Sequence, residues 1–398
     1  MRAHPQVPMK SLTLLSTLTA LTLLDPAIAS EVPVVAPTAP QVEWYQGAYM
    51  SALGTARHQD RMVCVYFWSG SSPNCSRMYQ ETLSSPPAAQ ILSDFVCYSA
   101  DAANATGARL LARYQVSTVP TILLLNPEGE AQDAIIGFAG PNTFASEVDR
   151  IRRGEETVST LRTLSSASPD DLSLRLRLSI KLGVVGARQE RDELLNSIRR
   201  DDPHGNTLVG ARLAFWDVRD PLQVELSTAT DVTKVDFDPL YRHTKLIRKP
   251  AVAFEAWQWL GDAEFGRGDQ KKGRTAMLEA WTHLPAGQEV EWATRAVLAF
   301  WGMRDELNGR EKKLILEIAD VLETKSRALL SPAAEDPSYP LEDGQSVESV
   351  VSMALSAKAC ALHINGKKRD ARKLAKEAIQ LSPDDSELVA RLDSVLNK

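Results

Sequence analysis

From residue 44 to residue 154, short apolar runs alternate with amphipathic segments, which is the pattern of strands that alternate with helices. The run from Met62 to Trp68 is apolar almost throughout, as expected for a central strand covered on both faces. Further strands are predicted over Phe95–Ser99, Pro120–Leu125 and Ala131–Phe138, the last of them at an edge. Helices are predicted over Gln46–His58, Pro73–Leu83, Ser85–Leu92, Gly107–Tyr114 and Thr143–Arg152, with a turn at 126–129. This alternation predicts a layered α/β domain.

From Glu155 to the end of the chain the apolar positions follow a helical period. A Gly precedes a Pro by 17 residues three times, at Gly186, Gly268 and Gly366. Around the second of these, the pattern Trp257-x-x-Leu260-Gly261 with Ala280 and Pro285 resembles a tetratricopeptide repeat, whose period is about 34 residues. The three copies are not separated by multiples of that period, so we expect irregular helices between them. The segment 331–345 is predicted to be a loop.

The N-terminus has the pattern of a secretory signal. Arg2 and Lys10 precede an apolar stretch from Ser11 to Leu24, and Ala27-Ile28-Ala29 fits a cleavage site. Residues 1–29 are therefore predicted to be a signal peptide, followed by a Pro-rich linker over 30–42, and the mature chain is predicted to be periplasmic or secreted. The alternative is an uncleaved membrane anchor. No later run is long and apolar enough, on this prediction, to cross a membrane.

Composition excludes several classes of function. The chain of 398 residues has a net charge of −6 and no basic patch, which argues against nucleic-acid binding. Its six histidines are scattered without the spacing of metal ligands, so we expect no metal site. It has no Gly-rich phosphate loop, and no cofactor is predicted.

The candidate chemistry lies just after the Met62–Trp68 run, where Ser72-Pro73-Asn74-Cys75 stands in the place of a Cys-x-x-Cys redox motif. In such a motif the first thiolate sits at a helix N-terminus and attacks a disulfide, and the second Cys resolves the mixed disulfide. A hydroxyl at Ser72 cannot perform this exchange. Ser followed by Pro is, however, a favourable start for a helix, so Ser72 is predicted to be an N-cap.

Residues Trp44 to Gly154 resemble a thioredoxin-like domain, a resemblance carried above all by Phe67-Trp68, Cys75 and Val119-Pro120-Thr121. It implies a cis bond between Val119 and Pro120 beside the site loop, with the preceding backbone available to an extended peptide. It also implies a buried Asp before Phe-Trp, but Tyr66 stands there. We take Cys75 as the candidate catalytic residue. Candidate substrate-binding residues are Trp68, Ser72, Val119 and Pro120.

Two interpretations of Cys75 stay open: a packing residue left from a lost redox motif, or a monothiol that forms mixed disulfides or senses oxidation. The other three cysteines, Cys64, Cys97 and Cys360, are predicted to be buried, inert thiols. Six tryptophans in the helical half, from Trp216 to Trp301, fit either a helical core or an aromatic groove for a peptide.

Together these patterns predict an α/β thioredoxin-like domain over 43–155, followed by an all-α, tetratricopeptide-like helical domain over 156–398. The predicted function is a protein-binding or scaffold module of the cell envelope. Its partner would be a protein or peptide, such as a thiol-containing client, and a membrane would be involved only if the signal stays uncleaved. The competing hypothesis is a thiol-disulfide oxidoreductase that uses Cys75 as a single thiol.

Overall fold

The computed structural model describes residues 41–330 and 346–397. The predicted signal peptide, nearly all of the predicted linker and the predicted loop over 331–345 lie outside the described residues.

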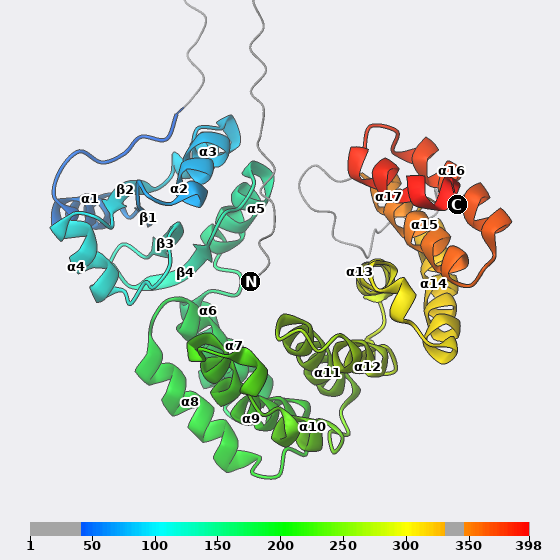
Figure 1. Ribbon diagram of the computed structural model, residues 1–398. Coiled ribbons are helices and arrows are strands. Elements are labelled where there is room, and N and C mark those ends of the chain that lie inside the picture. The colour runs from blue at the N-terminus through cyan, green and yellow to red at the C-terminus, as the bar shows by residue number, and fades with distance from the viewer. Residues whose placement is uncertain (1–40, 331–345, 398) are drawn as a thin grey trace, which may run out of the picture. The chain divides into compact units, whose positions relative to one another are not determined.

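The first part of the described chain is the predicted alternation of strands and helices (Figure 1). Its elements are α1 (Tyr49–Gln59), β1 (Val63–Trp68), α2 (Pro73–Arg77), the π-helix η1 (Met78–Leu83), α3 (Pro86–Leu92), β2 (Val96–Asp101), α4 (Ala105–Arg113), β3 (Thr121–Leu125), β4 (Ala131–Ile136) and α5 (Pro141–Arg152). The four strands form one sheet in the order β2-β1-β3-β4. Strand β1 runs parallel to β2 and antiparallel to β3, and β4 lies at an edge as predicted.

Strand β1 is buried on both faces, which confirms the interpretation of its apolar run. Val65 and Phe67 point into one layer with Leu53 of α1 and Leu110 of α4. Tyr66 points into the opposite layer, which contains residues of η1, α3 and α5. Because successive side chains of a strand point to opposite faces, a strand between two helical layers has to be apolar at nearly every position.

Two predicted helices differ from the structure. The predicted helix over 73–83 is divided into α2 and the π-helix η1, whose widened turns bury Met78, Thr82 and Leu83. The Thr82 hydroxyl there donates a hydrogen bond to the Ala139 carbonyl at 2.6 Å. The helix predicted from residue 46 begins instead at Tyr49, because the chain before it forms a β-bridge between Trp44 and Cys97. Both differences come from tertiary contacts that helical periodicity does not encode.

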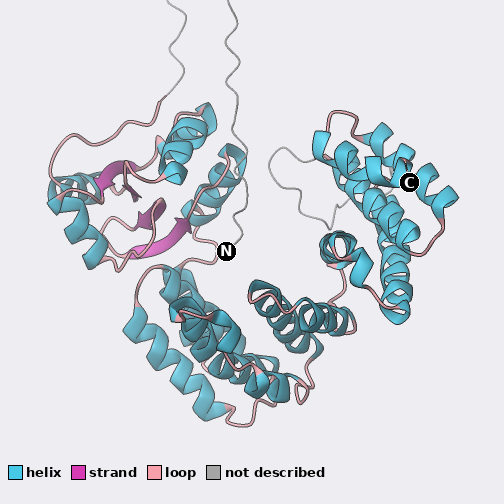
Figure 2. Cartoon of the chain, in the orientation of Figure 1, coloured by secondary structure: helices cyan, strands magenta, loops and turns pink. Residues whose placement is uncertain are grey.

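From residue 158 onward the described chain contains helices and no strand, as predicted (Figure 2). These are α6 (Val158–Ala167), α7 (Leu172–Val184), α8 (Arg188–Asp201), α9 (Leu208–Thr228), η2 (Val232–Lys234), α10 (Asp238–Thr244), α11 (Pro250–Gly266), α12 (Gln270–Trp281), α13 (Glu289–Gly302), η3 (Arg304–Glu306), α14 (Gly309–Leu329), α15 (Val347–Ile364), α16 (Lys368–Leu381) and α17 (Ser386–Leu396).

The three glycines of the recurring Gly–Pro spacing each end the first helix of a helical hairpin. Gly186, Gly268 and Gly366 have φ angles of +82°, +89° and +75°, a left-handed conformation that favours glycine. In each turn the glycine N–H donates three residues back and the next N–H donates five residues back, the pattern of a Schellman motif. The pairs α7–α8, α11–α12 and α15–α16 therefore share one turn geometry.

The core of the α/β part continues into the helices that follow it. Val158 and Leu161 of α6 and Leu178 and Leu182 of α7 belong to the same hydrophobic cluster as Phe67. One hydrophobic core thus contains residues from both sides of the predicted boundary between residues 155 and 156.

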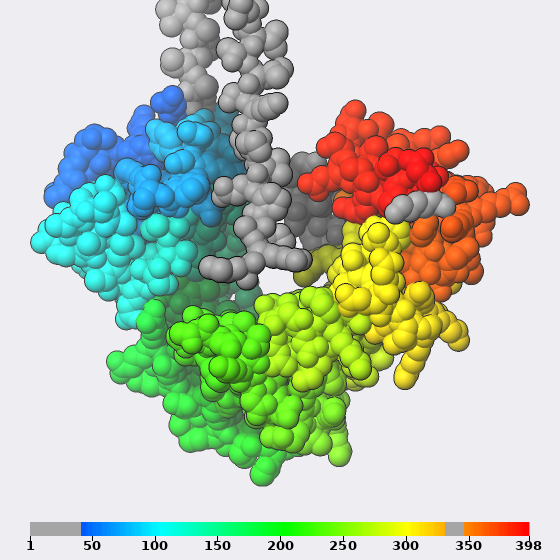
Figure 3. Space-filling model, in the orientation of Figure 1, coloured from blue at the N-terminus to red at the C-terminus, as the bar shows by residue number. Residues whose placement is uncertain are grey.

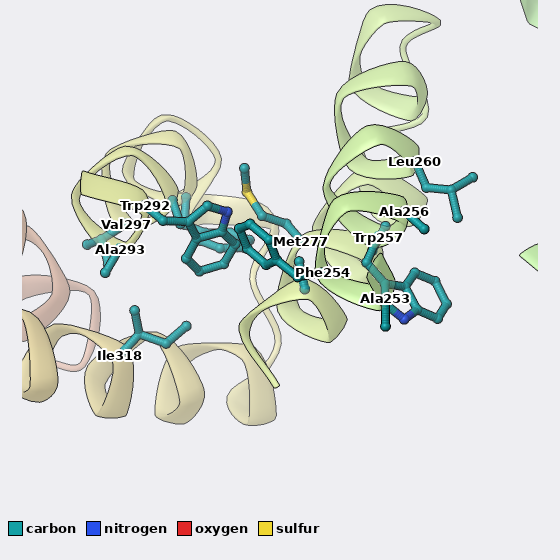
Figure 4. Packing of buried hydrophobic residues seen from close by; sticks show 14 of the residues in the cluster. Ala253, Phe254, Ala256, Trp257, Leu260, Met277, Trp292, Ala293, Val297 and Ile318 are labelled. Atoms are coloured by element: carbon teal, nitrogen blue, oxygen red, sulfur yellow. The ribbon is translucent and has the colours of Figure 1, made fainter. Parts of the chain in front are cut away.

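Aromatic side chains fill the core of the later helices. Trp257 of α11 and Trp292 of α13 are buried, and the rings of Phe254 and Trp292 lie 6.0 Å apart (Figure 4). The ring of Trp281 stacks on that of Trp292, and the two ring centroids lie 5.9 Å apart. Trp301 is also buried, while Trp216, Trp259 and Trp281 are partly buried against the same core. The tryptophans therefore serve as core residues, the first of the two interpretations.

Helix α15 corrects the prediction about membrane-crossing runs. By length and composition alone its 18 residues are apolar enough to span a membrane. In the structure, however, 67% of this span is buried inside the protein. Its side chains pack against α14, α16 and α17, so its apolar character is explained by a helix covered on most sides.

Candidate functional site

Ser72 is the N-cap of α2, as predicted. Its backbone is extended (φ −95°, ψ 115°), and its hydroxyl accepts a hydrogen bond from the backbone N–H of Cys75 at 3.3 Å. Pro73 occupies the first turn, where a missing N–H leaves no bond unmade. The hydroxyl that replaces the attacking thiol is thereby engaged in starting the helix.

Cys75 lies on the first turn of α2 and is only 2% exposed. The backbone N–H of Ser69 donates to its Sγ atom at 3.5 Å, which is within the reach of a weak hydrogen bond to sulfur. Its carbonyl oxygen accepts from the Tyr66 hydroxyl at 3.0 Å. The Ser69 N–H thus contacts the thiol itself, while the Tyr66 hydroxyl binds the backbone of Cys75.

Tyr66 occupies the position where the family resemblance implies a buried Asp. Burial, followed by the proximity of Cys75, raises the pKa of the Tyr66 hydroxyl well above its usual range. The phenol thus stays protonated at neutral pH and can donate a hydrogen bond to Cys75, but it cannot act as a base for the thiol.

The Cys75 thiol forms part of the wall of a cavity of about 410 Å³, which we call the Cys75 pocket. The pocket is lined by Trp44, Tyr66, Trp68, Ser69, Gly70, Cys75, Ser76, Tyr79, Gln80 and Ser99. Four of these side chains are aromatic, and none of the lining residues is Asp, Glu, Lys, Arg or His. Trp68 is held in place by a hydrogen bond from its indole N–H to the Ser99 hydroxyl at 2.9 Å. Such a lining suits an uncharged, largely apolar group.

Three candidate residues, Ser72, Val119 and Pro120, lie outside this lining. The bond between Val119 and Pro120 is cis, as the resemblance implies. Thr121 pairs with Phe67, so Pro120 and Trp68 sit at the same end of the neighbouring strands β3 and β1. Pro120 is itself buried, and Val119 is partly buried. The structure therefore brings Trp68 and Cys75 into one pocket, with Ser72 as the cap and Val119–Pro120 at the adjoining strand end.

Trp44, Tyr79 and Ser99 line the pocket but were not among the predicted site residues. Tyr79 follows Cys75 by four residues, a helical spacing that places two side chains on one face and could have identified it. Trp44 is brought in by its bridge to Cys97, and Ser99 by its register opposite Tyr66. No local signal in the sequence indicates these two positions.

The remaining cysteines are buried and free, as predicted. Cys64 and Cys97 face each other in the register of β1 and β2, and their mutual hydrogen bond, ahead of burial, raises the pKa of the Cys64 thiol. Burial raises the pKa of Cys360 in α15 to about 12. The thiols of Cys64 and Cys360 are thus kept protonated at neutral pH. Within residues 41–330 and 346–397, no group of three or more His, Cys, Asp or Glu side chains could hold a metal ion.

Comparison with known proteins relates the first part of the chain to one family. The family of thioredoxin-like domains matches residues 49–152, about a quarter of the chain. No curated protein matches the chain.

Three solved structures share parts of their sequence and fold with it. A thioredoxin from Thermus thermophilus is 29% identical and covers 29% of this chain and 90% of its own, with a TM-score of 0.27. A DsbH oxidoreductase is 20% identical, and the match covers 30% of this chain and 91% of that protein, with a TM-score of 0.26. The C-terminal domain of DsbD from Neisseria meningitidis, in its oxidised form, is 21% identical. The match covers 27% of this chain and 98% of that domain, with a TM-score of 0.23. From the family match and the four-stranded sheet, the chain carries an α/β thioredoxin-like domain followed by a long all-helical region.

Proposed function

We propose that this protein binds a protein partner through the Cys75 pocket and acts as a binding module rather than as a dithiol reductase. The observation that carries the proposal is the pocket itself. Its walls are aromatic and uncharged, and the hydroxyl of Ser72 beside it is engaged as a helix cap. A neutral, apolar side chain of a partner would bury its surface there, at about 25 cal/mol for each Å² removed from water.

The helical region supports a role in protein binding. Its three hairpins share the Gly turn and the Gly–Pro spacing, which favours a tetratricopeptide-like arrangement. Helical repeats of this kind offer extended surfaces to other proteins. The signal-like pattern of the N-terminal sequence supports a location in the periplasm or outside the cell as part of this proposal.

A monothiol oxidoreductase is the second candidate, favoured by the presence of Cys75 among the residues that line the pocket. In this reaction the Cys75 thiolate would attack a partner's disulfide, forming one new S–S bond and releasing the partner's other sulfur as a thiolate. A thiol such as glutathione would then attack the mixed disulfide and release Cys75 in reduced form.

The experiment first identifies partners of the exported protein by acid-quenched thiol trapping and cross-linking, each with mass spectrometry. Affinity for the identified partner is then measured for Trp68→Ala, Tyr79→Ala and Cys75→Ser. Met50→Ala, which truncates another exposed side chain on α1, is the matched control.

A binding module predicts that Trp68→Ala and Tyr79→Ala weaken binding by about tenfold or more, while Cys75→Ser and Met50→Ala do not. A monothiol enzyme predicts that the partner is captured as a mixed disulfide on Cys75 and that Cys75→Ser abolishes its capture. Unchanged affinity in both pocket variants would overturn the proposed function.

A further inference from the structure

A second cavity lies in the helical region, at a distance in sequence from the Cys75 pocket. It has a volume of about 460 Å³ and is formed by the 204–206 connection, α9, α10 and the segment that leads into α11. These elements are coloured green in Figure 3. We call it the α9–α11 cavity.

The titratable side chains that line this cavity are all basic, and the neutral amide Asn206 lies beside them. His204, His243, Arg248 and Lys249 line it, and no Asp or Glu is among its lining residues. The carboxylate of Asp202 lies nearby and accepts hydrogen bonds from the backbone N–H of Asn206 and from the backbone N–H and hydroxyl of Thr207. The lining therefore brings together hydrogen-bond donors and the cations Arg248 and Lys249, while the carboxylate of Asp202 lies close enough to His204 to interact with it.

His243 indicates that a polar ligand is expected there. Its Nε2 atom is buried and has no hydrogen-bond partner among the described residues. Leaving a buried polar atom without a partner is costly, so a polar group of a ligand that reached this ring atom would be favoured. Burial lowers the pKa of His243, and the neutral ring in its Nε2–H form would donate one hydrogen bond.

The N-terminus of α11 adds to the positive electrostatic potential at this cavity. Lys249 is the N-cap of this 17-residue helix and provides no side-chain cap, although N-caps are usually Ser, Thr, Asp or Asn. Arg248 and Lys249 thus place two cations against the positive end of the helix dipole, an arrangement that an anion would relieve.

Most of the remaining side chains of the lining are apolar. Ala211, Ala214, Leu246 and Ile247 complete the cavity wall, and Leu246 is 77% exposed although it is a large hydrophobic residue. A bare inorganic ion would leave this surface uncovered. We propose that the α9–α11 cavity binds a small organic anion, with an oxyanion head group on Arg248, Lys249 and His243 and an apolar body against Leu246 and Ile247.

Isothermal titration calorimetry of the full chain tests this with four probes: phenyl phosphate, benzoate, phenol and inorganic phosphate. We expect saturable binding of phenyl phosphate or benzoate at one site, and at least about tenfold weaker binding of phenol and of inorganic phosphate. The tighter of the two aromatic anions identifies the head group as phosphate or carboxylate. No saturable binding of either anion, or equal binding of phenol, overturns the proposal.

Variants locate the site. Arg248→Gln combined with Lys249→Gln is expected to weaken binding of the anion by about tenfold or more, since charge-assisted bonds are lost. Lys271→Gln with Lys272→Gln, the same change of charge on exposed residues of α12, should leave the affinity within about twofold. In NMR spectra the imidazole signals of His204 and His243 should shift on addition of the anion, while that of the exposed His58 should not. Equal affinity in both double variants overturns the proposal.

Discussion

The hydroxyl of Ser72 accepts a hydrogen bond from the backbone N–H of Cys75, 3.3 Å away. One residue in place of an expected Cys thus acts as a helix cap for the turn that holds the remaining thiol. Position 72 therefore affects both the stability of the helix start and the redox chemistry of the site, and different substitutions there can test each property.

Ser72→Cys is expected to create a dithiol reductase. The substitution restores two thiols at the spacing of a redox motif, on a helix start with Pro73 already in place. Insulin reduction by dithiothreitol should become faster with this variant, whereas the wild type and the double variant Ser72→Cys/Cys75→Ser should remain at background. A folded Ser72→Cys variant without activity would show that Tyr66 or access to the pocket, and not one missing sulfur, prevents the reaction.

Ser72→Ala is expected to lower the free energy of unfolding by about 1 kcal/mol, because the N–H of Cys75 loses its cap. Ser72→Asp should retain most of that stability, since its carboxylate can accept the same bond. Urea denaturation of both variants measures this difference. Equal stability of the Ala and Asp variants would mean that the cap contributes nothing.

Asp133 of β4 is expected to be a strong contributor to stability. Its side chain is 1% exposed and accepts hydrogen bonds from Arg150 of α5 and Lys181 of α7, both at 2.6 Å. Asp133→Ala leaves the partly buried Lys181 without its counter-charge and Arg150 with Glu147 alone, so we expect a loss of about 3 kcal/mol. Glu81→Ala, which breaks the half-exposed pair with Arg77, should cost less than about 1 kcal/mol. A similar small loss for both variants in urea denaturation would contradict this prediction.

Gly186→Ala is expected to be more destabilising than Gly366→Ala, although both glycines have the same role in their turns. A Cβ atom at Gly186 would lie 2.3 Å from the Tyr114 carbonyl oxygen, whereas at Gly366 nothing lies within 4 Å. The left-handed conformation costs about 1–2 kcal/mol at either position, and the backbone clash adds about 1–3 kcal/mol at Gly186. Thermal unfolding compares the two variants. Equal losses would show that the turn after α7 can move away from the end of α4.

Asp202 is expected to make stability depend on pH in the acid range. Burial favours its neutral form, but hydrogen bonds from Thr207 and Asn206, together with His204, outweigh burial and lower the pKa of the carboxyl group. Because the folded pKa lies below the unfolded one, the stabilisation is present above about pH 4 and is lost as pH falls through the folded pKa.

Asp202→Asn should therefore be less stable than the wild type by about 2 kcal/mol at neutral pH, and this gap should close on acidification. Urea denaturation at neutral pH and in steps below about pH 4 follows the gap. Asp170→Asn, on an exposed position, is the control. A gap that stays constant down to the lowest pH would refute the role of the Asp202 charge.

Local pattern determined the secondary structure and the start of the site helix. The apolar run of β1 predicted a doubly covered strand, and Ser72-Pro73 predicted the cap that the structure contains. The Gly–Pro spacing likewise predicted three helical hairpins. These features depend on a few neighbouring residues and on their preferred backbone angles, so they can be inferred from the sequence alone.

Tertiary structure decided which side chains meet. Trp44 and Ser99 reach the Cys75 pocket only through the pairing of strands, and Asp133 meets Lys181 from a helix 48 residues later. The anion-binding character of the α9–α11 cavity, proposed from His204, His243, Arg248 and Lys249, also comes from four positions that no local motif connects. Contacts between distant segments depend on how layers pack and on strand register, and short-range patterns of polarity carry no information about either.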